Sequence, residues 1–580
     1  MSRSSRHRRA AWAVLAAVLI AVGGSAVRAH VAAASTTQAL VLEDDSQLLD
    51  NPGLAVLEAR ELGFNTIRVM MYWGTVAPAA SSFHKPKGFV ASNPADYPAV
   101  NWAPYDNLVR VATSSGIRID IDLMGGAPLW ATGPGMPHDG GFPHYSWEPN
   151  AAEYGAFVKA VGTRYSGSFD PASGNEQPGN AADLPRVSFW SLWNEPDYGP
   201  SLAPQAVPHS RSVPEAPRLL RALLDHAWSA LAASGHRATG SGGRDTIIWG
   251  ELAPRGEPTF GYFNGMLPVP FLQSLYCTDA NDIPLQGRAA AQVGCPTTAA
   301  GSRAFAAQNP VLFKASGVSV HPYMRWYPPN DEEYTPRYRG VSLAQWRKVY
   351  LSSYTTLAVI GHLSSTLDRL VRAYHSSVRF PIWSTEFGYI TSPPKRRTKH
   401  DPYPYVNPAT AAYYDNWAEY ISYTNPRIAS FDQYLLQDNV EPTAATDWGQ
   451  FSSGLMTYGG VQKPGWDAFR MPIFLPQTTA PSSGSSLLVW GGVSPAPFAR
   501  SDLPGTAETV DLVFKPTGSS TYRTLATLPL TSTGGYYETH LRFPSSGTLI
   551  AQWSPPADPL LGVTAPGTVD ESRAVQVTVR

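Results

Sequence analysis

The chain of 580 residues has only two cysteines, Cys277 and Cys295. So few cysteines exclude a disulfide-rich scaffold. No CxxC pair or neighbouring histidine pair accompanies them, which argues against a metal site. In an exported protein a local disulfide between the two is expected, with two free buried thiols as the alternative.

The chain also lacks an excess of either charge. Lysine and arginine number 44 against 45 aspartates and glutamates, and charged residues make up only 15% of the sequence. With this balance, no basic stripe or acidic tail argues for nucleic-acid binding or electrostatic membrane binding. By contrast, 53 prolines, 49 glycines, 17 tryptophans and 28 tyrosines are many. They indicate long ordered loops with aromatic side chains, which either fill cores or line a cleft.

Long hydrophobic runs are confined to the N-terminus. A positive segment holds Arg3, Arg6, Arg8 and Arg9, the apolar run 10–22 follows, and the small residues Ala32-Ala33-Ala34 suit processing. Residues 1–35 therefore read as an export signal, with an uncleaved membrane anchor as the alternative. We expect a secreted protein without stable membrane insertion after processing.

Short apolar strands alternate with amphipathic helical stretches over residues 36–474. The eight strand candidates are 39–42, 66–71, 118–123, 187–193, 246–249, 317–320, 382–384 and 428–435. Helical spacing of apolar residues is clearest at 153–165 and 215–233. Eight such units predict an α/β fold, a (β/α)₈ TIM barrel. A doubly wound open sheet is the alternative, but no glycine-rich phosphate loop follows the first strand.

A different pattern begins after the barrel. Residues 475–486 are rich in Pro, Ser, Thr and Gly and are typical of a linker. Residues 487–580 show short alternating strands at 487–493, 509–514, 522–528, 536–543, 548–553 and 575–579. They predict a small all-β, Ig-like sandwich. Such a domain either braces the barrel or binds polysaccharide through Trp490, Tyr522 or Trp553.

Two glutamates follow predicted strands in aromatic surroundings. Glu195 lies in Trp193-Asn194-Glu195-Pro196 after the fourth strand, and Glu386 lies in Trp383-Ser384-Thr385-Glu386-Phe387-Gly388 after the seventh. Active sites of (β/α)₈ barrels lie at the carboxyl ends of the strands. Two carboxyl groups facing each other are what cleavage of a glycosidic bond requires. Desolvation by Trp193 and its neighbours is expected to raise the pKa of the acid.

These two segments resemble the retaining glycoside hydrolases of the clan that carries two strand-end glutamates on a (β/α)₈ barrel. That clan includes cellulase-like, mannanase, xylanase and β-xylosidase families. The resemblance covers most of the first 475 residues and none of the C-terminal domain. It implies that Glu195 is the general acid/base and Glu386 the nucleophile. It also implies that Asn194 binds the sugar 2-hydroxyl.

Three further segments carry the same resemblance. Arg68 on the second strand resembles the arginine beneath the nucleophile, with a structural ion pair elsewhere as the alternative. His321 and Tyr323 after the sixth strand resemble a pair whose tyrosine touches the nucleophile. His321 is expected in a substrate subsite, with a satisfied core histidine as the alternative. Trp130, in Gly126-Ala127-Pro128-Leu129-Trp130, resembles an aromatic at the subsite floor, with plain loop packing as the alternative.

The chain departs from the clan at the eighth strand, where many members place a tryptophan under the sugar. Tyr434, Gln437 or the later Trp448 are the candidates to replace it. Glu251, after the fifth strand, is a further acidic residue able to contact substrate, without a catalytic role.

The leading hypothesis is therefore a secreted retaining glycosidase that acts by double displacement on an oligo- or polysaccharide, with no metal or cofactor. A transglycosidase with the same intermediate and a non-catalytic carbohydrate-binding protein are the alternatives. The sequence leaves the sugar, endo or exo action and the oligomeric state open.

Overall fold

The computed structural model describes residues 35, 37–137, 143–177, 179–180, 182–334, 341–391, 406–441, 451–565 and 567–580. The predicted export signal, apart from residue 35, and Trp448 lie outside the described residues. Among the described helices, none is long and apolar enough to cross a membrane.

Eight parallel strands form the central sheet, in the order β10-β1-β2-β3-β6-β7-β8-β9. A bridge between Ile382 and Ile428 joins the two edges, so the sheet is a nearly closed barrel. The predicted (β/α)₈ fold is confirmed, and each predicted strand corresponds to one observed strand. These are β1 (Ala39–Glu43), β2 (Thr66–Met70), β3 (Arg118–Leu123), β6 (Phe189–Leu192), β7 (Thr246–Leu252), β8 (Gly317–Val320), β9 (Ile382–Ser384) and β10 (Ser430–Tyr434).

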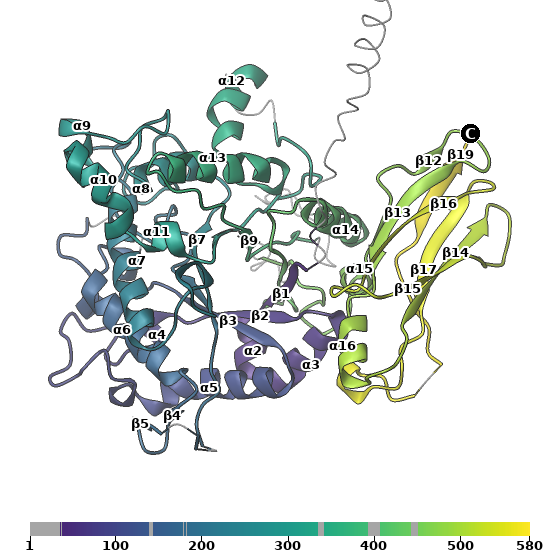
Figure 1. Cartoon of the computed structure of the whole chain (residues 1–580), viewed down its shortest axis with the longest axis horizontal. Helices are drawn as coiled ribbons and strands as arrows, with labels where there is room; N and C mark the ends of the chain where they lie inside the picture. Colours follow the sequence, from purple (N-terminus) through teal and green to yellow (C-terminus); the bar gives the residue numbers. More distant parts are fainter. Residues whose placement is uncertain are drawn as a thin grey trace, which may run out of the picture.

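Helices surround this barrel (Figure 1). They include α3 (Pro52–Leu62), α5 (Ala99–Ser114), α6 (Ala151–Arg164), α7 (Ala216–Ala233), α8 (Pro268–Leu275), α13 (Ile360–Arg372) and α14 (Pro408–Thr424). α7 buries the leucines of its apolar face, as its spacing predicted. The predicted disulfide between Cys277 and Cys295 is present in the connection that follows α8.

Alternation along the strands separates two kinds of side chain. On β2, Ile67 and Val69 pack in the main core with the helices, while Arg68 between them belongs to the opposite, inner face. On β3, Asp120 and Asp122 alternate with apolar residues in the same way. A small apolar cluster of Ala39, Val41, Phe189, Ile248 and Trp383 packs inside the barrel. Charged groups therefore gather toward the carboxyl ends of the strands.

The C-terminal part contains two sheets around a second core, and all their strand pairs but one are antiparallel. One joins β11 (Ile473–Phe474), β13 (Ser486–Gly492) and β16 (Tyr536–Arg542). The other joins β12 (Thr479–Ala480), β19 (Val575–Val579), β17 (Gly547–Trp553), β14 (Thr509–Pro516) and β15 (Arg523–Pro529), with β18 (Asp570–Glu571) beside β17. The stretch 475–486 contributes β12, which pairs with β19. The short helix α16 (Ala496–Asp502) was not foreseen, because it covers only two turns.

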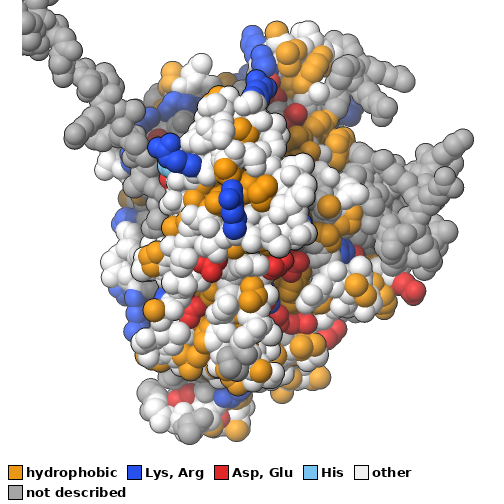
Figure 2. Space-filling view, turned by 90° about the vertical axis from the view of Figure 1, so that its right-hand side faces the viewer, with side chains coloured by type: hydrophobic (Ala, Val, Ile, Leu, Met, Phe, Trp, Pro, Cys, Tyr) orange, Lys and Arg blue, Asp and Glu red, His pale blue; other side chains and the backbone are white. Residues whose placement is uncertain are grey.

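Aromatic rings fill the contact between the barrel and this β domain. Trp417 of α14 stacks on Phe474, with 5.7 Å between ring centroids, and Trp490 stacks on Tyr536 at 5.5 Å. The Tyr536 hydroxyl donates to the carboxylate of Glu419 on α14 over 3.0 Å. Trp490 and Trp553 are fully buried, so they serve packing rather than surface recognition. The face in Figure 2, on the side of the β domain, carries scattered charges of both signs.

Removing the Trp490 ring should loosen this contact. We expect Trp490→Ala to lower the free energy of unfolding by about 3–5 kcal/mol, because the cavity left at the aromatic contact cannot close. Urea unfolding followed by circular dichroism measures it. Tyr522→Ala, at a ring that is 38% exposed on the same domain, is the control and should cost less than about 1 kcal/mol. Equal midpoints for the two variants would contradict a bracing role.

Candidate active site

The residues predicted to act together lie at the carboxyl ends of the barrel strands. Asn194 and Glu195 follow β6, Tyr323 follows β8 and Glu386 follows β9, and all four line one cavity of about 490 Å³. Trp193 and Glu195 have φ values of 68° and 42°. This left-handed backbone, costly for residues other than glycine, turns the chain at the strand end.

The two carboxylates are close to each other. An oxygen of Glu195, an oxygen of Glu386 and a ring nitrogen of His321 all lie within 4.8 Å of one another. The Glu386 side chain is 8% exposed, whereas that of Glu195 is 23% exposed. One carboxylate is therefore held in the floor of the cavity and the other faces its opening.

Three side chains fix the carboxylate of Glu386. Arg68 Nη1 donates to Oε1 over 3.2 Å, the Tyr323 hydroxyl donates to Oε2 over 3.0 Å, and His321 Nδ1 lies 3.4 Å from Oε2. Burial raises the pKa of Glu386, and the charges of His321 and Arg68 oppose that effect. The contacts predicted for Arg68 and Tyr323 are both present. The pKa of Glu386 is nevertheless raised overall, because the effect of burial is larger than that of the positive charge of Arg68.

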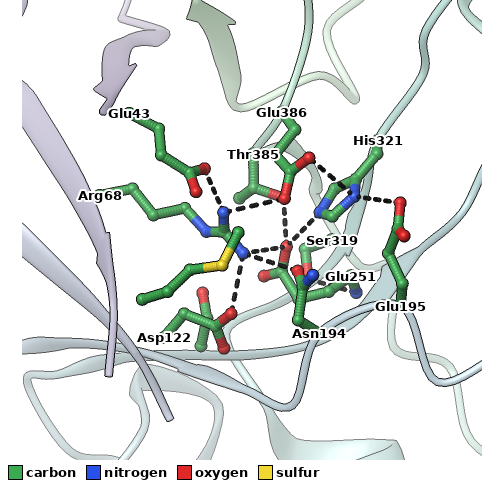
Figure 3. A network of polar contacts seen from close by, with 12 residues as sticks. Glu43, Arg68, Asp122, Asn194, Glu195, Glu251, Ser319, His321, Thr385 and Glu386 are labelled. Carbon is green, nitrogen blue, oxygen red and sulfur yellow. Dashed lines mark hydrogen bonds and ion pairs between the residues drawn. The ribbon is translucent and has the colours of Figure 1, made fainter. Parts of the chain in front are cut away.

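Arg68 contacts more groups than the one predicted (Figure 3). Its guanidinium, with no exposed surface, binds Glu43, Asp122, Glu251, Glu386 and the Oδ1 of Asn194. Burial alone would lower its pKa, but the surrounding carboxylates raise the pKa of Arg68 well above its usual range. One cation therefore holds four carboxylates that come from different strands.

His321 lies between the two cavity carboxylates and a third one beneath them. Nδ1 is 3.0 Å from Glu195 Oε1, and Nε2 is 3.0 Å from Glu251 Oε2. Burial opposes protonation, but Glu386 and the hydrogen bonds to Glu195 and Glu251 raise the pKa of His321 to about 10. Burial also opposes the charge of Glu251, yet Arg68 and His321 lower the pKa of Glu251 to about 2.

Some residues of this polar network were not predicted from the sequence. Glu43, Asp122 and Asp432 are fully buried in the barrel interior, and burial raises the pKa of each. Glu251 is more central than expected, since it contacts both Arg68 and His321. The sequence does contain a pattern that indicates such residues. Charged residues alternate with apolar ones along a strand, as in Arg118-Ile119-Asp120-Ile121-Asp122.

Trp130, predicted at the subsite floor, and Trp193, expected to desolvate the acid, both lie away from the cavity. Trp130 packs edge-on against Trp73 and Phe89, and its Nε1 donates to the carbonyl of Pro78. Trp193 is fully buried and packs against Tyr154 of α6. Neither is among the residues that line the cavity.

Other aromatic residues line the cavity instead. Tyr434, at the end of β10, occupies the strand-eight position, with its ring 5.7 Å from that of Phe451. The Gln437 amide donates to the carbonyl of Tyr458. Tyr72, Tyr198 and Phe451 are 37%, 44% and 41% exposed at the rim, and Trp326 joins them. Such ring faces suit stacking against the C–H faces of a ligand.

Glu195, His321 and Glu386 also form the one group among the described residues whose geometry could hold a metal ion. Both ring nitrogens of His321 already contact carboxylates. These contacts place the imidazole where it can exchange protons with its neighbouring carboxylates.

No protein-family model matches the chain, and no curated protein matches it. Among solved structures, a family 39 glycoside hydrolase from Bacteroides cellulosilyticus WH2 is 14% identical with a TM-score of 0.43, over 88% of this chain and 80% of that one. An endo-β-1,4-mannanase from Thermotoga petrophila is 11% identical with a TM-score of 0.35, over 94% and 98%. A GH5_18 variant from Streptomyces cattleya in complex with Manβ1-4GlcNAc is 14% identical with a TM-score of 0.40, over 76% and 84%.

Removing Arg68 should leave its carboxylates uncompensated. We expect Arg68→Met to lower the free energy of unfolding near pH 7 by about 3–5 kcal/mol. The loss should shrink as the pH falls, because the unpaired carboxyl groups then bind protons. Denaturant unfolding at several pH values measures both effects. Arg347→Met, at an exposed ion pair with Glu332, is the control and should cost less than about 1 kcal/mol. A pH-independent loss of the same size as the control would contradict the role of Arg68.

Proposed function

We propose that the chain is a secreted retaining glycoside hydrolase in which Glu386 is the nucleophile and Glu195 the general acid/base. The separation of the two carboxylates is the observation that carries the proposal. Their nearest oxygens lie within 4.8 Å. Retaining enzymes place the two carboxyl groups about 5–5.5 Å apart, whereas inverting enzymes need about 6.5–9.5 Å for an intervening water.

The contacts of each carboxylate suit its proposed role. Glu386 is held by Arg68 and Tyr323 on the cavity floor, which fixes an oxygen for attack on the anomeric carbon. The charge of Arg68 favours the ionised form that a nucleophile needs. Glu195 is more exposed and lies across the cavity, where it protonates the leaving oxygen and later deprotonates water. Asn194, whose Oδ1 is held by Arg68, is placed to bind the 2-hydroxyl.

The cavity suits a carbohydrate ligand in size and lining. Its volume of about 490 Å³ falls within the usual range for small-ligand sites. Aromatic rings at its rim and the carboxylates of Glu195 and Glu386 match a sugar ring with apolar faces and polar hydroxyl edges. We propose an oligo- or polysaccharide as substrate and an export signal over residues 1–35. The Cys277–Cys295 disulfide is consistent with an oxidising compartment.

Loss of the nucleophile should abolish turnover. We expect Glu386→Ala to lower kcat on aryl glycosides by about 10⁴-fold or more, because the substitution removes the carboxylate that forms the covalent intermediate. A panel of aryl β-glycosides with a chromogenic leaving group measures it. Glu419→Ala, at a buried glutamate of the domain contact, is the control for indirect effects. Equal loss in both variants would contradict the assignment of Glu386.

The effect of removing the general acid Glu195 should depend on the leaving group. We expect Glu195→Ala to slow glycosides of poorly acidic phenols by about 10²–10⁴-fold, because these leaving groups need a proton. Dinitrophenyl leaving groups need no protonation, so the rate at which these glycosides form the intermediate should fall far less. Azide, which attacks without a general base, should restore breakdown of the intermediate. The same loss for every leaving group would contradict the acid role.

A further inference from the structure

Both ring nitrogens of His321 contact carboxylate oxygens (Figure 3). Nδ1 lies 3.0 Å from Glu195 and 3.4 Å from Glu386, and Nε2 lies 3.0 Å from Glu251. A neutral imidazole has one N–H group and one lone pair. In a neutral ring, the lone pair of one of these nitrogens would therefore face a carboxylate oxygen and repel it. The arrangement therefore needs an additional proton, held on the ring or on the facing carboxyl group.

The backbone of β7 is distorted at the point that brings Glu251 under the ring. The register between β7 and β8 shifts between Trp249 and Leu252, as at a β-bulge. Gly250 has φ of 124°, and a Cβ there would lie 2.6 Å from the carbonyl oxygen of Ser319. Glu251 follows with φ of 42°, and its N–H donates to Ser319 Oγ over 2.9 Å. A costly local conformation thus directs one carboxylate at His321.

Glu251 can influence the reaction only through other residues. It is fully buried and is not among the groups that line the cavity. Its Oε2 accepts hydrogen bonds from His321, Thr385 and Arg68. The negative charge is therefore fixed directly behind the imidazole.

We propose that Glu251 is a positioning residue that keeps His321 doubly protonated, so that His321 Nδ1 stores the proton that Glu195 delivers. This inference rests on the proposed glycosidase function and deepens it. The three groups Glu251, His321 and Glu195 then form one proton relay. Glu251 itself remains ionised throughout the reaction.

The proton balance of the relay is simple. The stored proton moves from His321 Nδ1 to Glu195 Oε1 and then to the glycosidic oxygen. The bond from that oxygen to the anomeric carbon breaks as Glu386 bonds to the carbon. His321 is left neutral, with its Nε2–H still donated to Glu251. In the second step water bonds to the anomeric carbon, the bond to Glu386 breaks, and the water proton returns through Glu195 to His321.

The charges around the ring favour this resting state. Three carboxylates from the ends of β6 and β9 and from β7 contact the imidazole, and the single guanidinium of Arg68 is shared with other carboxylates. The further charged groups that act on His321 are Asp122 of β3, Asp197 after β6 and Asp432 of β10. All three are acidic, but burial raises the pKa of each, so they stabilise an imidazolium only in their ionised forms.

Nitrogen NMR of the full chain with ¹⁵N-labelled histidine tests the stored proton without turnover. The signal of His321 is assigned by its loss in His321→Gln. We expect both ring nitrogens of the wild type to carry protons near pH 8. In Glu251→Gln the pKa of His321 should fall by about 1–3 units, because one contacting negative charge is removed. A neutral imidazole in the wild type near pH 8 would overturn the relay.

The pH dependence of kcat/KM provides the second readout. In Glu251→Gln the basic limb should move to lower pH by about 1–3 units, because the relay loses its proton more easily. Glu251→Asp keeps the charge and should keep the wild-type limb at reduced kcat. Glu419→Gln, at another fully buried glutamate, should leave the profile unchanged.

The outcomes separate the two proposals. A lower kcat in Glu251→Gln with an unmoved basic limb would show a merely structural role and overturn the relay. Lack of turnover by the wild type on every glycoside would contradict the proposed function instead. A neutral His321 in an active enzyme contradicts only the relay.

Discussion

The guanidinium of Arg68 is the interaction on which the rest of this site depends. It is fully buried and contacts four carboxylates and one amide that come from β1, β3, β7 and the ends of β6 and β9. Burying so many acidic groups is costly, and the positive charge of Arg68 offsets part of that cost. Arg68 therefore allows a low-dielectric floor to hold the carboxylate of Glu386 while Glu195 remains near the opening.

Arg68 and His321 have different roles in the site. Arg68 holds carboxylates from below, whereas His321 links the two cavity carboxylates from the side. In the proposed reaction the first supplies a fixed charge and the second a movable proton. The β domain contributes no residue to the lining of the cavity among the described residues. Its aromatic contact with α14 instead stabilises the helix that follows β9.

Much of this arrangement could be predicted from the sequence. The strands were recognisable because apolar β-branched residues cluster and end at polar motifs, and Glu195 and Glu386 stood at two of those ends. Glu43 was not recognised, because a single acid within a strand does not indicate which face it occupies. The alternation of Asp120 and Asp122 indicates a shared face of β3, but only the closed barrel shows that this face points inward. Trp130 was expected at the sugar, but its ring packs against Trp73 and Phe89. Local motifs specify backbone position, whereas the direction of a side chain depends on packing partners distant in sequence.

The central claim is that Glu195 and Glu386 lie at the separation that supports a double displacement. Proton NMR of the anomeric signal during the first minutes of hydrolysis tests it most directly, with a β-glycoside that the enzyme cleaves. Two successive displacements at the anomeric carbon predict that the β-anomer of the free sugar appears first and then mutarotates. Initial formation of the α-anomer would contradict the account, because it requires direct attack by water.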